Sequence, residues 1–133
     1  MRRTTLAACL AAVAVAATGC TSSTDSSSDF SGEEKKVAET IEDLQDAAVQ
    51  REPGRVCDDV LASALVRRLG RRCSDVVKQA FDDTDDPDLT VTDVRISGRT
   101  ARARVEVGRD KEEATTLELV RERDEWRISS FGG

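Results

Sequence analysis

Residues 101–107 read Ala-Arg-Ala-Arg-Val-Glu-Val, so small or aliphatic side chains alternate with charged ones along the whole segment. Successive side chains of an extended strand point to opposite faces, and this alternation gives one apolar and one charged face. Residues 89–96 also follow a period of two, and the Ser97-Gly98 pair between the two segments is typical of a turn. The sequence therefore predicts a β-hairpin that begins at about residue 89.

The hairpin continues into two further predicted strands. One spans about residues 114–123, and the other holds Trp126 and Ile128. The polar pair Asp124-Glu125 lies between them and favours a turn. Four strands joined in this way form an antiparallel meander.

The chain before residue 89 follows the period of helices instead. A capping-box pattern of Ser31 and Glu34 predicts that the first helix begins at Ser31, and Pro53-Gly54 is expected to end it. One apolar stripe along this helix is formed by Val37, Ile41, Leu44 and Ala48.

Two more helices are expected between this helix and the strands. One begins near Arg55, and after a break at Gly70 another runs from about residue 71 to 81. Helices first and an antiparallel sheet second predict an α+β fold, with the N-terminal helices packed on about four strands.

The first 19 residues have the layout of a secretory signal peptide. Met1-Arg2-Arg3 is basic, residues 6–17 are almost wholly apolar, and small residues lead up to Cys20. Ala17-Thr18-Gly19-Cys20 resembles the lipobox of bacterial lipoproteins, in which the cysteine receives a diacylglycerol before cleavage in front of it. We therefore expect a lipid anchor on Cys20, at the extracytoplasmic face of the cell membrane. The alternative is an ordinary signal peptide cut nearby, which leaves a soluble secreted protein.

The expected domain organisation follows from this reading. Residues 1–19 are the predicted signal peptide, and residues 20–30 are the predicted lipidated cysteine and flexible tether, since Ser, Thr and Asp alone fill positions 21–29. Residues 31–133 are expected to form one domain. The apolar leader is too short to span a bilayer, so no lasting transmembrane helix is predicted.

Amino-acid usage indicates the type of organism that encodes the chain, and the net charge limits the classes of partner. Sixteen Arg against four Lys, with no Asn, Tyr or His, indicate a GC-rich coding sequence and hence a high-GC bacterium. Because residues 1–19 hold two arginines and no acid, the predicted mature chain carries 18 basic and 26 acidic side chains, a net charge of −8. This charge disfavours nucleic acid as a partner.

Two cysteines remain once Cys9 is lost with the leader and Cys20 carries lipid. Outside the cytoplasm, Cys57 and Cys73 are expected to pair as a disulfide. A redox-active or metal-binding pair is the alternative, but the chain has no histidine and no Cys-x-x-Cys spacing.

The order of helices, Pro-Gly break, cysteine-bearing helix and meander resembles the NTF2-like superfamily, specifically the small NTF2-like lipoproteins of high-GC bacteria. The resemblance covers about residues 31–131, and its most specific part is Asp124-Glu125-Trp126-Arg127-Ile128. A cystatin-like or unrelated α+β sheet is the alternative. The resemblance implies a curved sheet folded against the helices, with a pocket at the open end of a cone.

Enzymes of this superfamily place a Tyr, His or Asp in that pocket. Tyr and His are absent here, so the usual oxyanion donor and acid/base are missing. The resemblance therefore favours a non-enzymatic role, with no catalytic residue, cofactor or metal site expected.

Three other features carry a functional hypothesis beside a structural one. The acidic run Asp82–Asp88 could hold calcium but is more typical of a solvated connection. Trp126 could line a pocket but more often anchors a core. The third feature is a basic cluster of Arg67, Arg68, Arg71 and Arg72. It could touch anionic headgroups or an acidic partner. The structural alternative is that nearby acids neutralise it, namely Asp58, Asp59 and Asp75.

The function predicted from the sequence is that of an exported, membrane-anchored lipoprotein whose domain binds an envelope protein or a small apolar ligand. One alternative is a small-molecule enzyme of the isomerase or dehydratase kind that uses pocket carboxylates such as Asp93 or Glu118. Another is a purely structural envelope protein that acts through its surface alone.

Overall fold

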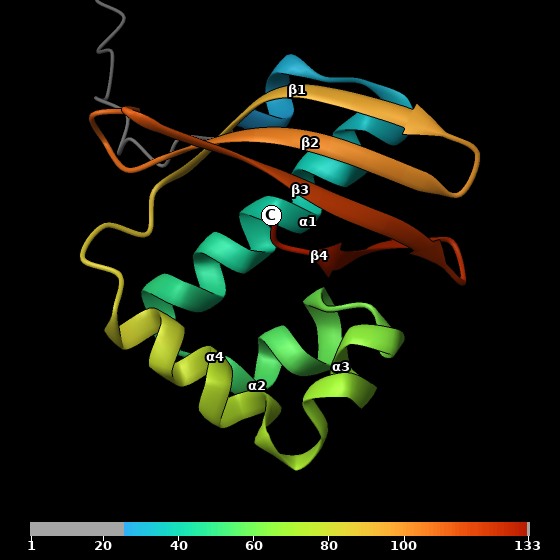
Figure 1. The fold of residues 1–133 in the computed structure, drawn as a ribbon. Coiled ribbons are helices and arrows are strands. Elements are labelled where there is room, and N and C mark those ends of the chain that lie inside the picture. Colours follow the sequence, from blue (N-terminus) through green and yellow to red (C-terminus); the bar gives the residue numbers. More distant parts are fainter. Residues whose placement is uncertain (1–25, 133) are drawn as a thin grey trace, which may run out of the picture.

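The computed structural model describes residues 26–132 and consists of helices packed on a four-stranded sheet (Figure 1). The predicted leader, lipobox and lipidation at Cys20 lie outside these residues. The helical elements are, in chain order, η1 (Ser26–Asp29), α1 (Gly32–Gln50), α2 (Pro53–Arg55), η2 (Val56–Val60), α3 (Ser63–Leu69), η3 (Gly70–Arg72) and α4 (Cys73–Asp82). The strands are β1 (Leu89–Ser97), β2 (Thr100–Val107), β3 (Glu113–Glu122) and β4 (Glu125–Ser130).

The four strands form one antiparallel sheet in the order β1-β2-β3-β4, as the meander prediction requires. Figure 1 shows a strongly twisted sheet with α1 crossing one face, while α2, α3 and α4 gather below the β4 edge. The predicted α+β class, with helices on a curved antiparallel sheet, is confirmed.

The alternation in β2 has the predicted effect. Ala101, Ala103 and Val105 are buried, whereas Arg102 and Arg104 between them are exposed. The inward face of the sheet meets the apolar stripe of α1, and the largest fully buried side chains of this core include Ile41, Val37, Leu119 and Ile128.

Strand β1 departs from strict alternation through a β-bulge. Val91 pairs with Val105, but Asp93 pairs with Arg104, so Thr92 is an extra residue without a partner position. The bulge brings Val91 and Val94 to the same buried face, although they are three residues apart.

The helix termini differ in detail from the sequence prediction. Ser31 is the N-cap of α1, but its side chain makes no capping hydrogen bond, so the predicted capping box is wrong. The helix already ends at Gln50, because Arg51 adopts a left-handed conformation with φ 56°. Pro53 instead starts the short helix α2, where its missing N–H costs nothing.

The predicted tether is shorter than residues 20–30. Ser26–Asp29 form the 3-10 turn η1, in which Ser26 and Ser27 are buried. The backbone N–H of Val91 donates to Ser26 Oγ at 3.2 Å, and the backbone N–H of Ser27 donates to Glu42 Oε1 at 2.6 Å. A polar segment is ordered here because β1 and α1 satisfy its hydrogen-bonding groups.

Candidate functional site

An apolar cavity of about 550 Å³ lies between the helices and one end of the sheet. The C-terminal half of α1 provides Leu44, α4 provides Phe81, and the beginning of β1 provides Leu89. Further apolar lining comes from Ala48, Val56, Leu61, Leu65, Leu69, Val77, Ala80, Pro87 and Val107.

The most exposed large apolar side chains gather on this cavity. Val49 is 61% exposed, Phe131 46% and Val76 39%, which are the highest exposures of large hydrophobic residues within residues 26–132. They come from α1, from the segment after β4 and from α4, yet all three line the same cavity. Single exposed apolar residues are ordinary, but their convergence on one concave surface is typical of a binding site.

Two of the charged residues that line the cavity, Arg51 and Asp86, are engaged with other groups of the protein. Arg51 donates to Asp82 at 2.7 Å, and Lys78 bonds the other oxygen of Asp82 at the same distance. The backbone N–H of Arg109 donates to Asp86 and is the main reason that the pKa of Asp86 lies below its ordinary value. The third, Asp85, is exposed, so the interior of the cavity is apolar.

This lining suits binding better than proton transfer. Its ionisable members are Arg51, Asp85 and Asp86, and the pKa of Asp86 is lowered rather than raised, so Asp86 stays ionised at neutral pH. A carboxylic acid that acts as a general acid near pH 7 needs apolar surroundings that raise its pKa. Burial raises the pKa of the Asp43 carboxyl, which lies outside the cavity on α1 beside Arg55.

The two carboxylates suggested for an enzymatic role lie elsewhere. Asp93 is exposed on β1 and accepts a hydrogen bond from Arg95 at 3.0 Å. Glu118 is exposed on β3 and forms an ion pair with Arg102 at 3.2 Å. Neither side chain lines the cavity, because both occupy outward positions of their strands, so the expectation that they line the cone is wrong for this pair.

The predicted disulfide is present. Cys57 in η2 and Cys73 at the beginning of α4 are bonded, with their Cα atoms 6.2 Å apart. Both residues are buried in the helical part of the core. The bond closes a loop that contains α3 and η3.

Trp126 takes the role of a core anchor. It is 3% exposed, and its indole N–H donates to Glu33 Oε2 at 2.9 Å. The Thr40 hydroxyl donates to the backbone carbonyl of Trp126 at 3.2 Å. These two bonds tie β4 to the first half of α1, away from the apolar cavity.

The acidic run forms the connection from α4 to β1. Asp82 ends α4, and Asp86 and Asp88 both face Arg109, at 3.7 and 3.4 Å. Within residues 26–132, no group of three His, Cys, Asp or Glu side chains is placed to hold a metal ion.

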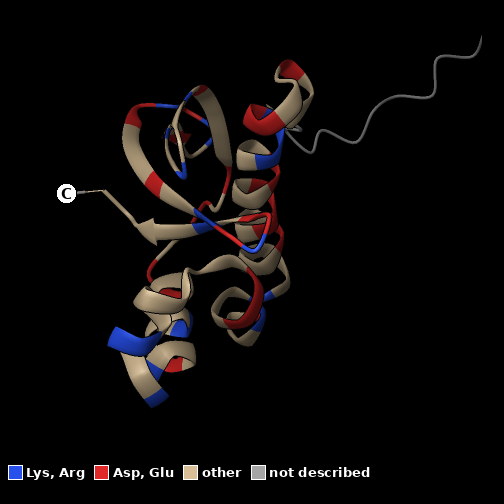
Figure 2. Ribbon diagram, turned by 90° about the vertical axis from the view of Figure 1, so that its right-hand side faces the viewer, with Lys and Arg blue, Asp and Glu red and all other residues tan. Residues whose placement is uncertain are grey.

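The arginine cluster, defined as Arg67, Arg68, Arg71 and Arg72, lies on α3 and η3 and is exposed (Figure 2). The prediction that Asp58, Asp59 and Asp75 neutralise it is wrong: none of the four arginines forms an ion pair in the part of the chain that the structure describes. Arg68 donates one hydrogen bond, to the backbone carbonyl of Ser129 at 3.4 Å.

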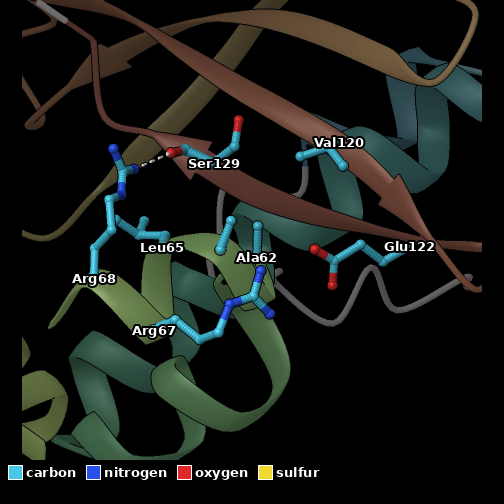
Figure 3. Close-up of a pocket in the computed structure, with 8 residues that line it drawn as sticks. Ala62, Leu65, Arg67, Arg68, Val120, Glu122 and Ser129 are labelled. Carbon is cyan, nitrogen blue, oxygen red and sulfur yellow. Dashed lines mark hydrogen bonds between the residues drawn. The ribbon is translucent and has the colours of Figure 1, made fainter. Parts of the chain in front are cut away.

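A second cleft, of about 540 Å³, separates α3 from β3 and β4 (Figure 3). Arg67, Arg68 and Leu65 form the helix side, while Val120 and Glu122 form the sheet side. This cleft is more open than the apolar cavity and combines aliphatic with cationic groups.

Sequence reasoning missed the residues that mark the apolar cavity most clearly. Val49 lies one position past the apolar stripe of α1, and Phe131 follows the last strand. The available signal was an aliphatic side chain on a polar helix face and an aromatic residue beyond a strand end. Only the tertiary arrangement brings the two together.

Comparisons with known proteins give matches among solved structures alone. No protein-family model matches the chain, and no curated protein matches its sequence. Among solved structures, one titled "De novo designed NTF2 fold protein NT-9" is similar, with 18% sequence identity and a TM-score of 0.45. The match covers 76% of this chain and 85% of the designed protein. In residues 26–132, no helix is long and apolar enough to cross a membrane.

Proposed function

We propose that this chain is an exported NTF2-like lipoprotein, anchored through Cys20, whose domain holds a small uncharged apolar ligand in the cavity between α1, α4 and the sheet. The convergence of Val49, Val76 and Phe131 on that cavity carries the proposal. Burying apolar surface contributes roughly 25 cal/mol per Å², so covering these side chains supplies a driving force for binding.

The size and the charge of the cavity support this choice of ligand. Its volume of about 550 Å³ falls within the range of roughly 300–1,000 Å³ for small-molecule sites. Arg51 and Asp86 at the mouth are paired with protein groups, so a charged ligand would have to break existing bonds. An uncharged ligand needs no such exchange.

The anchor rests on the sequence of the first 20 residues. A basic start, a short apolar run and Ala17-Thr18-Gly19-Cys20 support export and lipidation. Two or three acyl chains hold a protein firmly at a membrane, whereas one does so only marginally.

Ligand binding is tested on the full-length chain with Nile red, an uncharged apolar dye. Val49→Asp places a carboxylate on the cavity lining at a position that already faces solvent, and Val49→Thr keeps the size without the charge. We expect Val49→Asp to weaken dye binding at least tenfold, about 1.4 kcal/mol, and Val49→Thr by less than threefold. Equal binding by both variants, or no binding by the unmodified chain, overturns the proposed ligand site.

The anchor is tested separately by intact-mass measurement on the protein from membranes of an exporting bacterium. We expect the chain to begin at Cys20 and to carry added acyl mass, and Cys20→Ser to remove that mass and release the protein from the membrane fraction. An unprocessed chain without acyl groups in the cytosol contradicts the anchor.

A further inference from the structure

The segment from Ser63 to Arg72 packs against the core through half-buried aliphatic side chains and leaves its arginines in solvent. Neither α3 nor η3 contains a buried residue. Four of its ten residues are the arginine cluster. Leu65, Val66 and Leu69 supply its packing against the core, whereas the four arginine side chains are exposed, so packing does not fix their identity.

The arginine cluster holds four of the eight Lys and Arg side chains that form no ion pair within residues 26–132. Ten other Lys and Arg side chains of the described chain form ion pairs, including exposed ones such as Arg95 and Arg109. The four clustered guanidinium groups are left without an acid, on a protein with an excess of acids. Like charges within one short segment repel each other, and this arrangement favours an external anion.

The segment from Ser63 to Arg72 is also held firmly at both ends. At its N-terminal end the Glu122 carboxylate accepts the backbone N–H of Ser63 at 3.0 Å and the Ser63 hydroxyl at 2.8 Å. At its C-terminal end the Cys57–Cys73 disulfide joins it to η2. A fixed presentation of charged groups lowers the entropy cost of binding a partner.

The cluster borders the second cleft, which adds an apolar component to the surface. Figure 3 shows Arg67 and Arg68 beside Leu65, with Val120 on the opposite wall. An aliphatic side chain fits between Leu65 and Val120 while a neighbouring carboxylate meets the arginines. Arginine binds carboxylates through two parallel hydrogen bonds, which adds geometric selectivity.

The position of the cluster discriminates between two anionic occupants. The described chain begins with η1 at the top of both views, whereas the helical end with α3 lies at the bottom (Figures 1 and 2). The 19 residues of α1 alone extend about 28 Å between these ends. Given the proposed anchor at Cys20, the cluster lies at the end of the domain opposite to the start of the described chain, which favours a partner other than the anchoring membrane.

We infer that the arginine cluster and the cleft beside it dock an acidic segment of a partner protein, in which glutamate or aspartate alternates with aliphatic residues. The carboxylates bind the guanidinium groups, and an aliphatic side chain enters the cleft between α3 and β3. This surface is separate from the apolar cavity. Only the choice of a protein over the membrane rests on the proposed anchor.

The test uses the full-length chain in a neutral detergent and a labelled peptide of alternating glutamate and leucine, followed by fluorescence anisotropy. Arg67→Gln, Arg71→Gln and Arg72→Gln are combined, and Arg68 is kept because it bonds Ser129. The matched control combines Arg104→Gln, Lys111→Gln and Arg123→Gln, which are exposed cations without an ion pair in residues 26–132. Both triple variants remove three charges.

We expect the cluster variant to weaken peptide binding at least tenfold, the control variant by less than threefold, and a glutamine-leucine peptide not to bind. An unchanged circular dichroism spectrum and melting temperature of the cluster variant show that it is folded. Equal weakening in both variants, equal binding of the uncharged peptide, or no binding by the unmodified chain overturns the inference. Binding to phosphatidylglycerol vesicles that depends on the cluster, without peptide binding, assigns the surface to a membrane and also overturns it.

Discussion

Glu33 illustrates how one side chain joins distant parts of this chain. Its carboxylate accepts hydrogen bonds from Lys36 on the same helix and from the indole of Trp126, 93 positions away. The bond from Lys36, followed by that from Trp126, holds the pKa of Glu33 below its ordinary value of 4.5. In the unfolded chain both bonds are lost and the pKa returns to that value.

The first prediction is that Glu33 contributes to loss of stability in acid. Because the folded pKa is the lower one, the unfolded chain binds the proton more readily, so the contribution is present above pH 4.5 and is lost as pH falls through the folded pKa. The pKa values of Asp82 and Asp86 are also lowered, mainly by hydrogen bonds from Lys78 and from the backbone of Arg109 respectively. The pKa of Asp43 is raised, so its protonation in acid favours the folded state. Urea unfolding measured between about pH 5 and pH 3 should show a smaller decrease in unfolding free energy for Glu33→Gln than for the unmodified chain.

The control for this experiment is Glu34→Gln. Glu34 is exposed on the same turn of α1 and has no hydrogen bond or ion pair within the described chain. A pH dependence that Glu33→Gln leaves unchanged, or that Glu34→Gln alters equally, contradicts the role of the indole and Lys36 bonds.

At the residue scale, the disulfide could be predicted from the number of available cysteines. The hydrogen bonds and the orientation of individual side chains could not, because they depend on the three-dimensional geometry. Cys57 and Cys73 pair as expected, because few thiols were left to choose from. Ser31 occupies the N-cap position, but its side chain does not bond the helix. Asp93 and Glu118 have the right residue type for a pocket but face solvent.

At the scale of elements, the disulfide is the main covalent support of the helical end. It closes a loop across a sequence separation of 16 residues that contains α3. In the chain-entropy model, a loop of this length contributes roughly 3 kcal/mol to stability by restricting the unfolded chain.

The second prediction concerns Cys57→Ala combined with Cys73→Ala. We expect the unfolding free energy to fall by about 3 kcal/mol and the melting temperature by more than about 10 °C. Thermal unfolding followed by circular dichroism measures both. Adding a reducing agent should lower the melting temperature of the unmodified chain and leave that of the double variant unchanged; a drop in both would point to another cause.

Strands could be predicted more accurately than helices in this chain. The alternation of apolar and charged residues predicts the ends of β2 to within a residue or two. It does so because a strand with one buried face must keep this period of two. The bulge at Thr92 could not be foreseen, since a local pattern does not reveal which strand residue lacks a partner. The short pieces α2, η2 and α3 follow from packing and from Pro53 rather than from a long apolar stripe.

On the scale of the whole molecule, stability is divided between a packed body and a less buried helical end. Ile41, Ala103 and Val105 are fully buried where α1 meets the sheet. Helix α3 contains no fully buried residue and is held by the half-buried Leu65, Val66 and Leu69 together with its two attachments. Local opening of α3 therefore exposes less apolar surface than opening of β2, which disrupts the core.

The third prediction is that hydrogen exchange distinguishes these two parts. Amides of α3 should exchange at least about a hundredfold faster than those of β2, because their opening does not require global unfolding. Mass spectrometry of peptides from deuterated full-length protein resolves the two segments. Protection of α3 equal to that of β2 contradicts a locally opening helix.

The layer arrangement could be predicted from the order of periodicities, but the location of the cavity could not. The cavity depends on how far α4 is separated from the end of β2, and no local pattern encodes that separation. Val49 and Phe131 lie 82 positions apart, and neither carries a signal that refers to the other.

The burial of Trp126 has a practical consequence for optical spectroscopy. The chain contains one tryptophan and no tyrosine, so its near-ultraviolet fluorescence comes from a single indole ring. That ring is enclosed between β4 and α1 and bonded to Glu33. The emission wavelength therefore reports on one contact, and it should shift to the red when β4 detaches from α1.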